Sequence, residues 1–109
     1  ALAVGEATTE NGTSHFAAVD GSGTMVSYTS TIESSFGSGL MAGGFYLNNE
    51  LTDFSRNPRG ADGKPVANRV QGGKRPRSSM APTLVWDPQG RPVLAVGAAG
   101  GPTIPVQTA

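Results

Sequence analysis

The groups in this chain that could do chemistry are mainly hydroxyls and carboxylates, because thiols and imidazoles are scarce. The sequence has no Cys and a single His, His15. This composition excludes thiolate nucleophiles, disulfides and Cys-based zinc sites, and no metal site is predicted. A lone His at the start of a predicted strand is more often packed than catalytic, so no serine triad is predicted either. Gly73-Lys74 is followed by Arg75 where a phosphate loop needs Ser or Thr, so we expect no nucleotide and no other cofactor.

Five short segments combine hydroxyl, acidic and glycine residues in a distinctive order. They lie at residues 13–16, 34–39, 47–55, 74–83 and 97–101, and read TSHF, SSFGSG, LNNELTDFS, KRPRSSMAPT and GAAGG. Together they resemble the small subunit of gamma-glutamyltranspeptidases. The most specific parts are the Asn-Asn-acidic-x-x-Asp-Phe-Ser and Arg-Pro-x-Ser-Ser-Met-x-Pro stretches, and the resemblance runs from about Thr13 to the end of the chain.

The resemblance implies an N-terminal-nucleophile hydrolase, an α+β protein whose sheets are sandwiched between helical layers in an αββα arrangement. This fragment is expected to contribute mostly β-strands and ordered loops. Precursors of this kind cut themselves just before a Thr, and Thr13 matches that nucleophile, with Gly12 preceding the cut. The freed α-amino group, with a pKa of about 7.7–8.0, supplies the base that a Thr hydroxyl needs. Residues 1–12 are thus expected to be the tail before the cleavage site, and 13–109 the truncated N-terminal portion of the small catalytic subunit.

The same resemblance implies roles for four residues near the nucleophile. Thr31 corresponds to the hydroxyl that orients the nucleophile, and we expect it to share one strand face with Glu33. Glu50 and Asp53 match positions that hold the α-ammonium of the substrate, as anionic oxygens would. Glu33 stands where many members have Asn, so an extra carboxylate is expected to bind substrate and to favour a cationic group.

The resemblance also implies an anion-binding side of the site. Ser78 and Ser79 match the hydroxyl pair that binds the α-carboxylate of the substrate. Gly100 and Gly101 match the oxyanion hole, where the absence of a side chain lets backbone N–H groups approach a developing negative charge. Pro102 follows this pair where Ser is common, and it removes a backbone N–H beside the predicted oxyanion hole.

The elements that must position these residues are predicted to be strands. Residues 15–19 and 25–29 flank the turn-rich Asp20-Gly21-Ser22-Gly23, and 83–86 and 93–96 flank Asp87-Pro88-Gln89-Gly90, so each pair predicts a hairpin. Residues 37–81 are expected to be ordered loop, with one short strand at 45–47. A helix is expected only after Gly101, where the chain barely starts it.

The composition agrees with a folded piece of a larger protein. The chain of 109 residues has 16 Gly and 8 Pro, and Leu, Ile, Val and Phe make up only about 19% of it. Eight basic and eight acidic residues cancel, which removes the self-repulsion typical of disordered chains and gives no overall attraction to nucleic acid. The basic residues at 69, 74, 75 and 77 are interpreted as a solvated loop, because no aromatic residues lie among them to stack on bases.

The resemblance implies γ-glutamyl transfer or hydrolysis of glutathione-like donors through an acyl-enzyme, with water, an amino acid or a peptide as acceptor. The implied partner is the large subunit of the same precursor, and exposed apolar edges would favour self-association of the fragment. Family members are often periplasmic or extracellular. Two alternatives stay open: an acylase of the same superfamily acting on glutaryl or β-lactam side-chain amides, and a non-catalytic fragment. The isolated, unprocessed fragment is expected to be inactive, because the nitrogen of Thr13 is still in a peptide bond.

Overall fold

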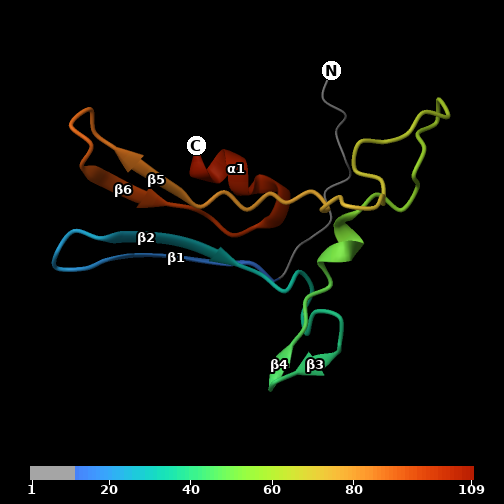
Figure 1. Cartoon of the computed structure of the whole chain (residues 1–109), viewed down its shortest axis with the longest axis horizontal. Coiled ribbons are helices and arrows are strands. Elements are labelled where there is room, and N and C mark those ends of the chain that lie inside the picture. The colour runs from blue at the N-terminus through green and yellow to red at the C-terminus, as the bar shows by residue number, and fades with distance from the viewer. Residues whose placement is uncertain (1–11) are drawn as a thin grey trace.

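The molecule is built from three two-stranded antiparallel sheets joined by long ordered loops (Figure 1). The computed structural model describes residues 12–109; most of the predicted tail, residues 1–11, lies outside them. The strands pair as β1 with β2, β3 with β4 and β5 with β6. Strands and ordered loops dominate and helix is scarce, which confirms that part of the prediction.

The first hairpin joins β1 (Ser14–Val19) to β2 (Met25–Ser30), within a residue of the predicted bounds. Its register runs without a break from Ser14 opposite Ser30 to Val19 opposite Met25. The turn is closed by Asp20, whose Oδ1 accepts hydrogen bonds from the backbone N–H groups of Ser22 (2.8 Å) and Thr24 (2.9 Å). A short Asp side chain can make such local bonds, so it specifies the turn.

The carboxyl group of Asp20 gives the turn a measurable pH dependence. The Ser22 hydroxyl, followed by the Thr24 backbone N–H, lowers the Asp20 pKa from 3.8 to about 2. Because the pKa is lower in the folded state, the stabilisation is complete above the unfolded pKa and is lost as the pH falls toward 2. We expect the amide resonances of Ser22 and Thr24 to titrate with a midpoint near this pKa, and Asp20→Asn to abolish the titration. A midpoint at the ordinary Asp value would contradict the hydrogen-bonded turn.

The second hairpin joins β5 (Thr83–Trp86) to β6 (Pro92–Val96), with an irregularity in register between Val85 and Trp86. Asp87 closes its turn as Asp20 closes the first. Its Oδ1 accepts from the backbone of Gln89 and Arg91, both at 2.9 Å, and its Oδ2 pairs with Arg91 Nε at 2.7 Å. The backbone N–H of Arg91 contributes most to lowering the Asp87 pKa. Both predicted hairpins are therefore confirmed.

The two hairpins lie side by side (Figure 1), and side chains of the first hairpin join them. Ser27 Oγ donates to the carbonyl oxygen of Val96 (2.9 Å) and accepts from the backbone N–H of Thr83 (3.1 Å). His15 hydrogen-bonds to Thr29 (2.8 Å) and lies against Gly97, just after β6. His15 is thus a packed residue, as the sequence predicts.

The long connection between the hairpins contains two short strands and one 3₁₀ turn. β3 (Met41–Ala42) pairs with β4 (Phe45–Tyr46), and η1 spans Glu50–Asp53. The predicted strand at 45–47 is confirmed as β4, but the sequence did not reveal β3 or η1. β3 and η1 are two and four residues long, and they show neither a periodicity nor the aromatic run that marks β4.

The chain ends in a short helical segment, as predicted. A 3₁₀ turn, η2 (Gly101–Thr103), leads directly into α1 (Ile104–Thr108). Within residues 12–109, no helix combines the length and apolar character needed to cross a membrane.

Little apolar surface is buried. Among the described residues, only Phe54 (8% exposed) and Ile104 (1%) are buried hydrophobic side chains. On the outer face of the first hairpin, Phe16 and Tyr28 stack with ring centroids 5.3 Å apart, yet each remains more than half exposed. This apolar face could pack against another layer of secondary structure, but none of the described residues covers it.

Candidate active site

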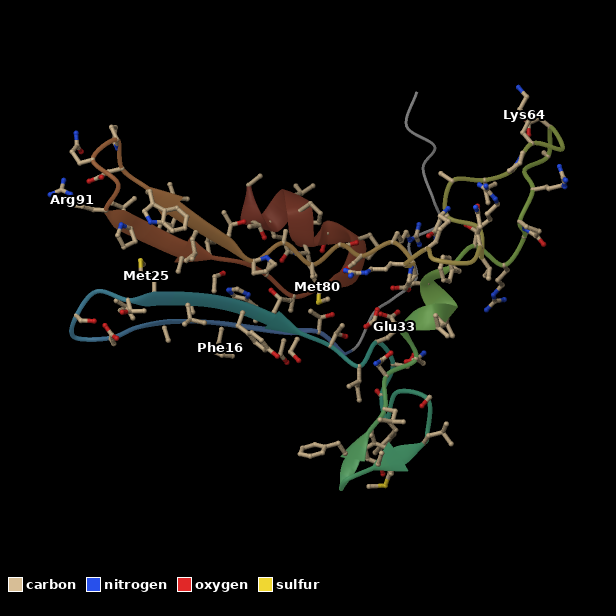
Figure 2. The ribbon with its side chains drawn as sticks, viewed as in Figure 1. Phe16, Met25, Glu33, Lys64, Met80 and Arg91 are labelled. Carbon is tan, nitrogen blue, oxygen red and sulfur yellow. The ribbon has the colours of Figure 1, made fainter. Side chains whose placement is uncertain are left out.

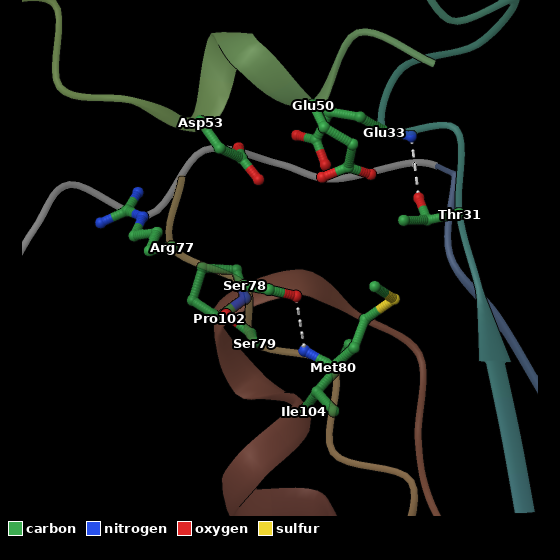
Figure 3. A pocket seen from close by; sticks show the side chains of 10 residues that line it. All are labelled: Thr31, Glu33, Glu50, Asp53, Arg77, Ser78, Ser79, Met80, Pro102 and Ile104. Carbon is green, nitrogen blue, oxygen red and sulfur yellow. Dashed lines mark hydrogen bonds between the residues drawn. The ribbon is translucent and has the colours of Figure 1, made fainter. Parts of the chain in front are cut away.

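An open pocket lies where the loop after β2, η1, the segment 77–80 and the start of the C-terminal helical segment meet (Figure 3). Four parts of the sequence that are far apart therefore build one site. Figure 3 shows the carboxylates on one side of the pocket and the serines on the other. The lining residues are Thr31, Glu33, Glu50, Asp53, Arg77, Ser78, Ser79, Met80, Pro102 and Ile104.

The loop after β2 places Thr31 and Glu33, but not as the sequence suggests. β2 ends at Ser30, so the prediction that the two residues share a strand face is wrong. Instead, the backbone N–H of Glu33 donates to Thr31 Oγ1 (2.8 Å), and Glu33 has a φ of 72°. This local hydrogen bond offers the backbone an alternative to strand pairing, so the chain turns here and both side chains line the pocket.

Three carboxylates converge on one side of the pocket. Oxygens of Glu33, Glu50 and Asp53 lie within 4.8 Å of one another, and all three residues are half-buried. Glu50 and Asp53 begin and end η1, which places them on one side of a single turn. Charge-assisted hydrogen bonds from a cation with several donors, such as a primary ammonium, fit this arrangement.

Asn49 holds η1 beside the loop after β2. Its Oδ1 accepts from the backbone N–H of Ser34 (3.0 Å), its Nδ2 donates to the Ser34 hydroxyl (3.0 Å), and its own N–H donates to the carbonyl of Ile32 (3.3 Å). Ser34 follows Glu33 and Asn49 precedes Glu50, so the hydrogen bonds between Ser34 and Asn49 bring Glu33 close to Glu50. The sequence shows Asn49 only as part of a family-like stretch.

Ser78 and Ser79 supply hydroxyls on the opposite side of the pocket. Ser78 Oγ accepts from the backbone N–H of Met80 (3.3 Å), and Ser79 is half-buried. Asn68 connects this segment to η1, because its Nδ2 donates to the carbonyl of Asp53 (2.6 Å) while its Oδ1 accepts from the N–H of Arg77 (3.0 Å). One amide side chain thus fixes the spacing between the acidic and hydroxyl sides.

Asn68 and Arg77 are site residues that sequence reasoning missed. Arg77 lines the pocket, and Asn68 accepts a hydrogen bond from the backbone N–H of Arg77 without lining the pocket itself. The sequence analysis includes Arg77 in a family-like stretch and in the basic loop, but it assigns no role in the site to this residue. Asn68 gave no signal, because a lone Asn in a turn-rich stretch is common.

The glycine segment reaches the same region from the second hairpin. Gly100 and Gly101 have φ values of 129° and 59°, which a residue with a side chain rarely adopts, and Gly101 is buried. Pro102 then contributes to the pocket wall. The backbone conformation therefore explains why glycine stands at both positions. Their expected role in stabilising an oxyanion stays a prediction.

Thr13 enters the region from the start of β1. Gly12 packs so tightly that a Cβ there would overlap the carbonyl oxygen of Glu33. The Gly12–Thr13 bond therefore lies next to a residue of the pocket wall. The pocket brings together the predicted residues at positions 31, 33, 50, 53, 78 and 79. Thr13, Gly100 and Gly101 do not line the pocket. Gly100 and Gly101 directly precede the lining residue Pro102, and Thr13 follows Gly12, which packs against the lining residue Glu33.

The contact between His15 and Gly97 should make position 97 intolerant of a side chain. A Cβ at Gly97 would overlap the His15 ring, so we expect Gly97→Ala to lower the free energy of unfolding by about 1–3 kcal/mol, as overpacking does. Thermal unfolding of the full-length protein measures this. Gly21→Ala is the matched control, because a Cβ there meets nothing within 4 Å. Equal stability of the two variants would contradict the packing.

Comparison with known proteins identifies a family. The gamma-glutamyltranspeptidase family model matches residues 2–109. The glutathione hydrolase proenzyme of Bacillus subtilis strain 168 is 50% identical over 97 residues, which are 87% of this chain and 15% of that protein. A highly active mutant of the Pseudomonas nitroreducens gamma-glutamyltranspeptidase is 41% identical with a TM-score of 0.69, over 84% of this chain and 50% of that one.

A third relative is an acivicin-inhibited gamma-glutamyltranspeptidase, for which critical roles of its C-terminus in autoprocessing and catalysis are described. It is 41% identical with a TM-score of 0.64, over 83% of this chain and 50% of that one. The chain thus spans half the length of these two solved chains and 15% of the B. subtilis protein. Because the family match extends over nearly all of the sequence and the solved relatives share its fold, the chain belongs to the gamma-glutamyltranspeptidase family.

Proposed function

We propose that this chain is the N-terminal portion of the small catalytic subunit of an enzyme that transfers or hydrolyses γ-glutamyl groups. Residues 13–109 form this portion and residues 1–12 are the tail before the cut, with the complete protein forming an αββα sandwich. The observation that carries the proposal is the pocket itself, in which three carboxylates face two serine hydroxyls. A free amino-acid end carries an ammonium and a carboxylate, and such a pocket suits both.

The first step is self-cleavage. The Thr13 hydroxyl oxygen attacks the carbonyl carbon of Gly12, and the bond from that carbon to the Thr13 nitrogen breaks. The nitrogen takes up a proton, so the amide becomes an ester. Water then hydrolyses the ester, which leaves a carboxylate on Gly12 and a free α-amino group on Thr13. The tight contact of Gly12 with Glu33 holds this bond beside the pocket.

Turnover uses the group that cleavage releases. The α-amino group accepts the proton of the Thr13 hydroxyl as its oxygen attacks the γ-carbonyl of the donor. Thr31 orients the nucleophile, and the N–H groups of Gly100 and Gly101 stabilise the oxyanion, each such donor contributing about 2.7–4 kcal/mol. The leaving amine departs with a proton, and water, an amino acid or a peptide then takes the acyl group from Thr13.

Recognition of the donor relies on the two sides of the pocket. Glu33, Glu50 and Asp53 hold the α-ammonium, and Ser78 and Ser79 hold the α-carboxylate. The relatives support a larger assembly, because the B. subtilis protein is a proenzyme of which this chain matches a small part. We infer that a large subunit from the same precursor covers the exposed apolar faces of the hairpins.

A comparison of two donors tests the proposal on the full-length, processed protein. A γ-glutamyl anilide carries the α-ammonium that the carboxylates would hold, whereas a glutaryl anilide lacks it. We expect kcat/KM to be at least about 10-fold higher for the γ-glutamyl anilide, the value of one charged hydrogen bond. Preference for the glutaryl compound would favour the acylase, and no turnover of either compound would favour a non-catalytic protein.

A further inference from the structure

The single histidine of the sequence lies between two parts of the site that the proposed reaction must bring together. His15 is in β1, two residues after the proposed nucleophile Thr13. Its ring contacts Gly97 so closely that a Cβ there would overlap three ring atoms. Gly97 is the first residue of the glycine segment 97–101, which ends in the two glycines of the proposed oxyanion hole. His15 therefore connects the strand that follows the nucleophile with the segment that would stabilise the oxyanion.

The first hairpin holds the His15 ring from below. His15 pairs with Thr29 across the hairpin, and His15 Nδ1 lies within hydrogen-bond distance of Thr29 Oγ1, at 2.8 Å. Side chains alternate along a strand, so this pair shares a face with Met25 and not with Phe16. Figure 2 shows Met25 directed toward the second hairpin and Phe16 directed away from it. The ring of His15 thus projects into the space between the hairpins.

The same face leads back to the nucleophile. The register of β1 and β2 runs without a break to Ser14 opposite Ser30. Continued by one residue, it would place Thr13 opposite Thr31, and both would lie on the face of His15. The nucleophile, the residue proposed to orient it and the His15 ring therefore follow one another along one side of the hairpin.

Packing alone does not explain a histidine at this position. Its Nε2 is buried and has no hydrogen-bond partner within residues 12–109. Burying a polar atom without a partner is unfavourable, and an apolar ring would fill the space without this penalty. What histidine adds is Nδ1, whose hydrogen bond to Thr29 holds the ring at one angle. This angle decides how closely the backbone at Gly97 approaches β1.

The other end of the glycine segment is anchored separately. Thr103 Oγ1 donates to the carbonyl oxygen of Gly100 (2.9 Å), which ties this end to the C-terminal helical segment. A displacement at the Gly97 end would therefore change the direction of the segment and shift its backbone N–H groups relative to Thr13. Reaction rates can fall about 100-fold when reacting groups are misplaced by about 1 Å.

We propose that His15 is a positioning residue, whose ring sets the distance between the Thr13 hydroxyl and the N–H groups of the glycine segment. This inference rests on the proposed function, which assigns the nucleophile and the oxyanion hole. His15 does not line the pocket, so it has no part in holding the ammonium or the carboxylate of the donor. Formation and breakdown of the acyl-enzyme both pass through an oxyanion. The loss of His15 should therefore lower kcat, whichever step limits it, and leave KM unchanged.

The test measures kcat and KM of the full-length, processed enzyme with a γ-glutamyl anilide, with rates divided by the cleaved fraction that intact mass gives. We expect His15→Ala to lower kcat about 10- to 100-fold and to keep KM within about twofold of the wild-type value. Asp20→Ala is the matched control for lost stability, because Asp20 closes the turn at the other end of the same hairpin (Figure 1). It should lower the melting temperature without changing kcat well below that temperature.

A second pair of variants tests the orientation of the ring while keeping its volume. Thr29→Val has nearly the shape of threonine but cannot hydrogen-bond to His15 Nδ1, whereas Thr29→Ser keeps the hydroxyl. We expect Thr29→Val to lower kcat about 3- to 10-fold, the equivalent of one neutral hydrogen bond, and Thr29→Ser to restore it. This pair decides the question if His15→Ala does not fold.

The possible results separate the inference from the proposed function. A wild-type kcat in His15→Ala or in Thr29→Val, with only the melting temperature lowered as in Asp20→Ala, would show a purely structural role and overturn the inference. A raised KM at unchanged kcat would overturn it as well, because it would place His15 in donor binding. A wild type that is cleaved but does not turn over the anilide would instead reject the proposed function.

Discussion

Thr13→Ala in the full-length precursor should leave the chain uncut and lower γ-glutamyl turnover by at least about 10³-fold, in line with the loss of a nucleophile in other acyl-transfer enzymes. The substitution removes the oxygen that attacks Gly12 and later carries the acyl group. It also leaves the nitrogen of residue 13 in a peptide bond, so the base is lost too. Intact-mass measurement detects the uncut chain, and release of anilide measures turnover.

Ser14→Ala is the matched control for the nucleophile. Ser14 is also a hydroxyl residue at the start of β1, but it is exposed and paired opposite Ser30 in the hairpin. We expect Ser14→Ala to be cut and active. If Thr13→Ala were still cut between residues 12 and 13, or still turned over donor at the wild-type rate, the assignment of Thr13 would be wrong.

Asp53→Asn should raise KM for a γ-glutamyl donor about 10- to 100-fold, which is the range for losing a hydrogen bond to a charged group. The amide keeps the shape of the side chain but removes its charge. The contact between Asn68 and this residue uses the backbone carbonyl of Asp53, so the spacing of the pocket sides is retained. Steady-state kinetics with saturation curves separates KM from kcat.

Asp62→Asn is the control for this change, because Asp62 is an exposed carboxylate in the loop 56–77 and is not one of the three convergent ones. It should leave KM for the γ-glutamyl anilide near the wild-type value. If the two variants had the same KM, Asp53 would have no special part in holding the ammonium, and the proposed orientation of the donor would fail.

The hairpins could be predicted because their information is local. Asp20 and Asp87 each close a turn through their own side chain, and the strands beside them are apolar runs of four to six residues, of which β2 alternates in burial. β3 and η1 could not be predicted, because two to four residues carry no periodicity and are held by contacts with distant segments. The pairing of η1 with the loop after β2 through Asn49 is one such contact.

The candidate site was predictable in its residue types but not in its geometry. The family-like stretches indicated Glu50, Asp53 and the serine pair, and the structure places them in one pocket. The turn that brings Glu33 beside them depends on a hydrogen bond to Thr31, which the strand-like pattern of the sequence concealed. Asn68 could not be found from the sequence, because its role depends on two backbone groups that are near each other only after folding.

Ile104 is the most deeply buried large side chain in the described structure, and it also lines the pocket. A substitution at this position is therefore expected to change both the stability of the fold and the shape of the pocket. A smaller residue at position 104, introduced to make room for a bulkier compound, would also remove packing from the most deeply buried large side chain. Directed evolution of new specificity in this protein should consequently begin from a variant strengthened elsewhere, for example in the turn regions of the two hairpins.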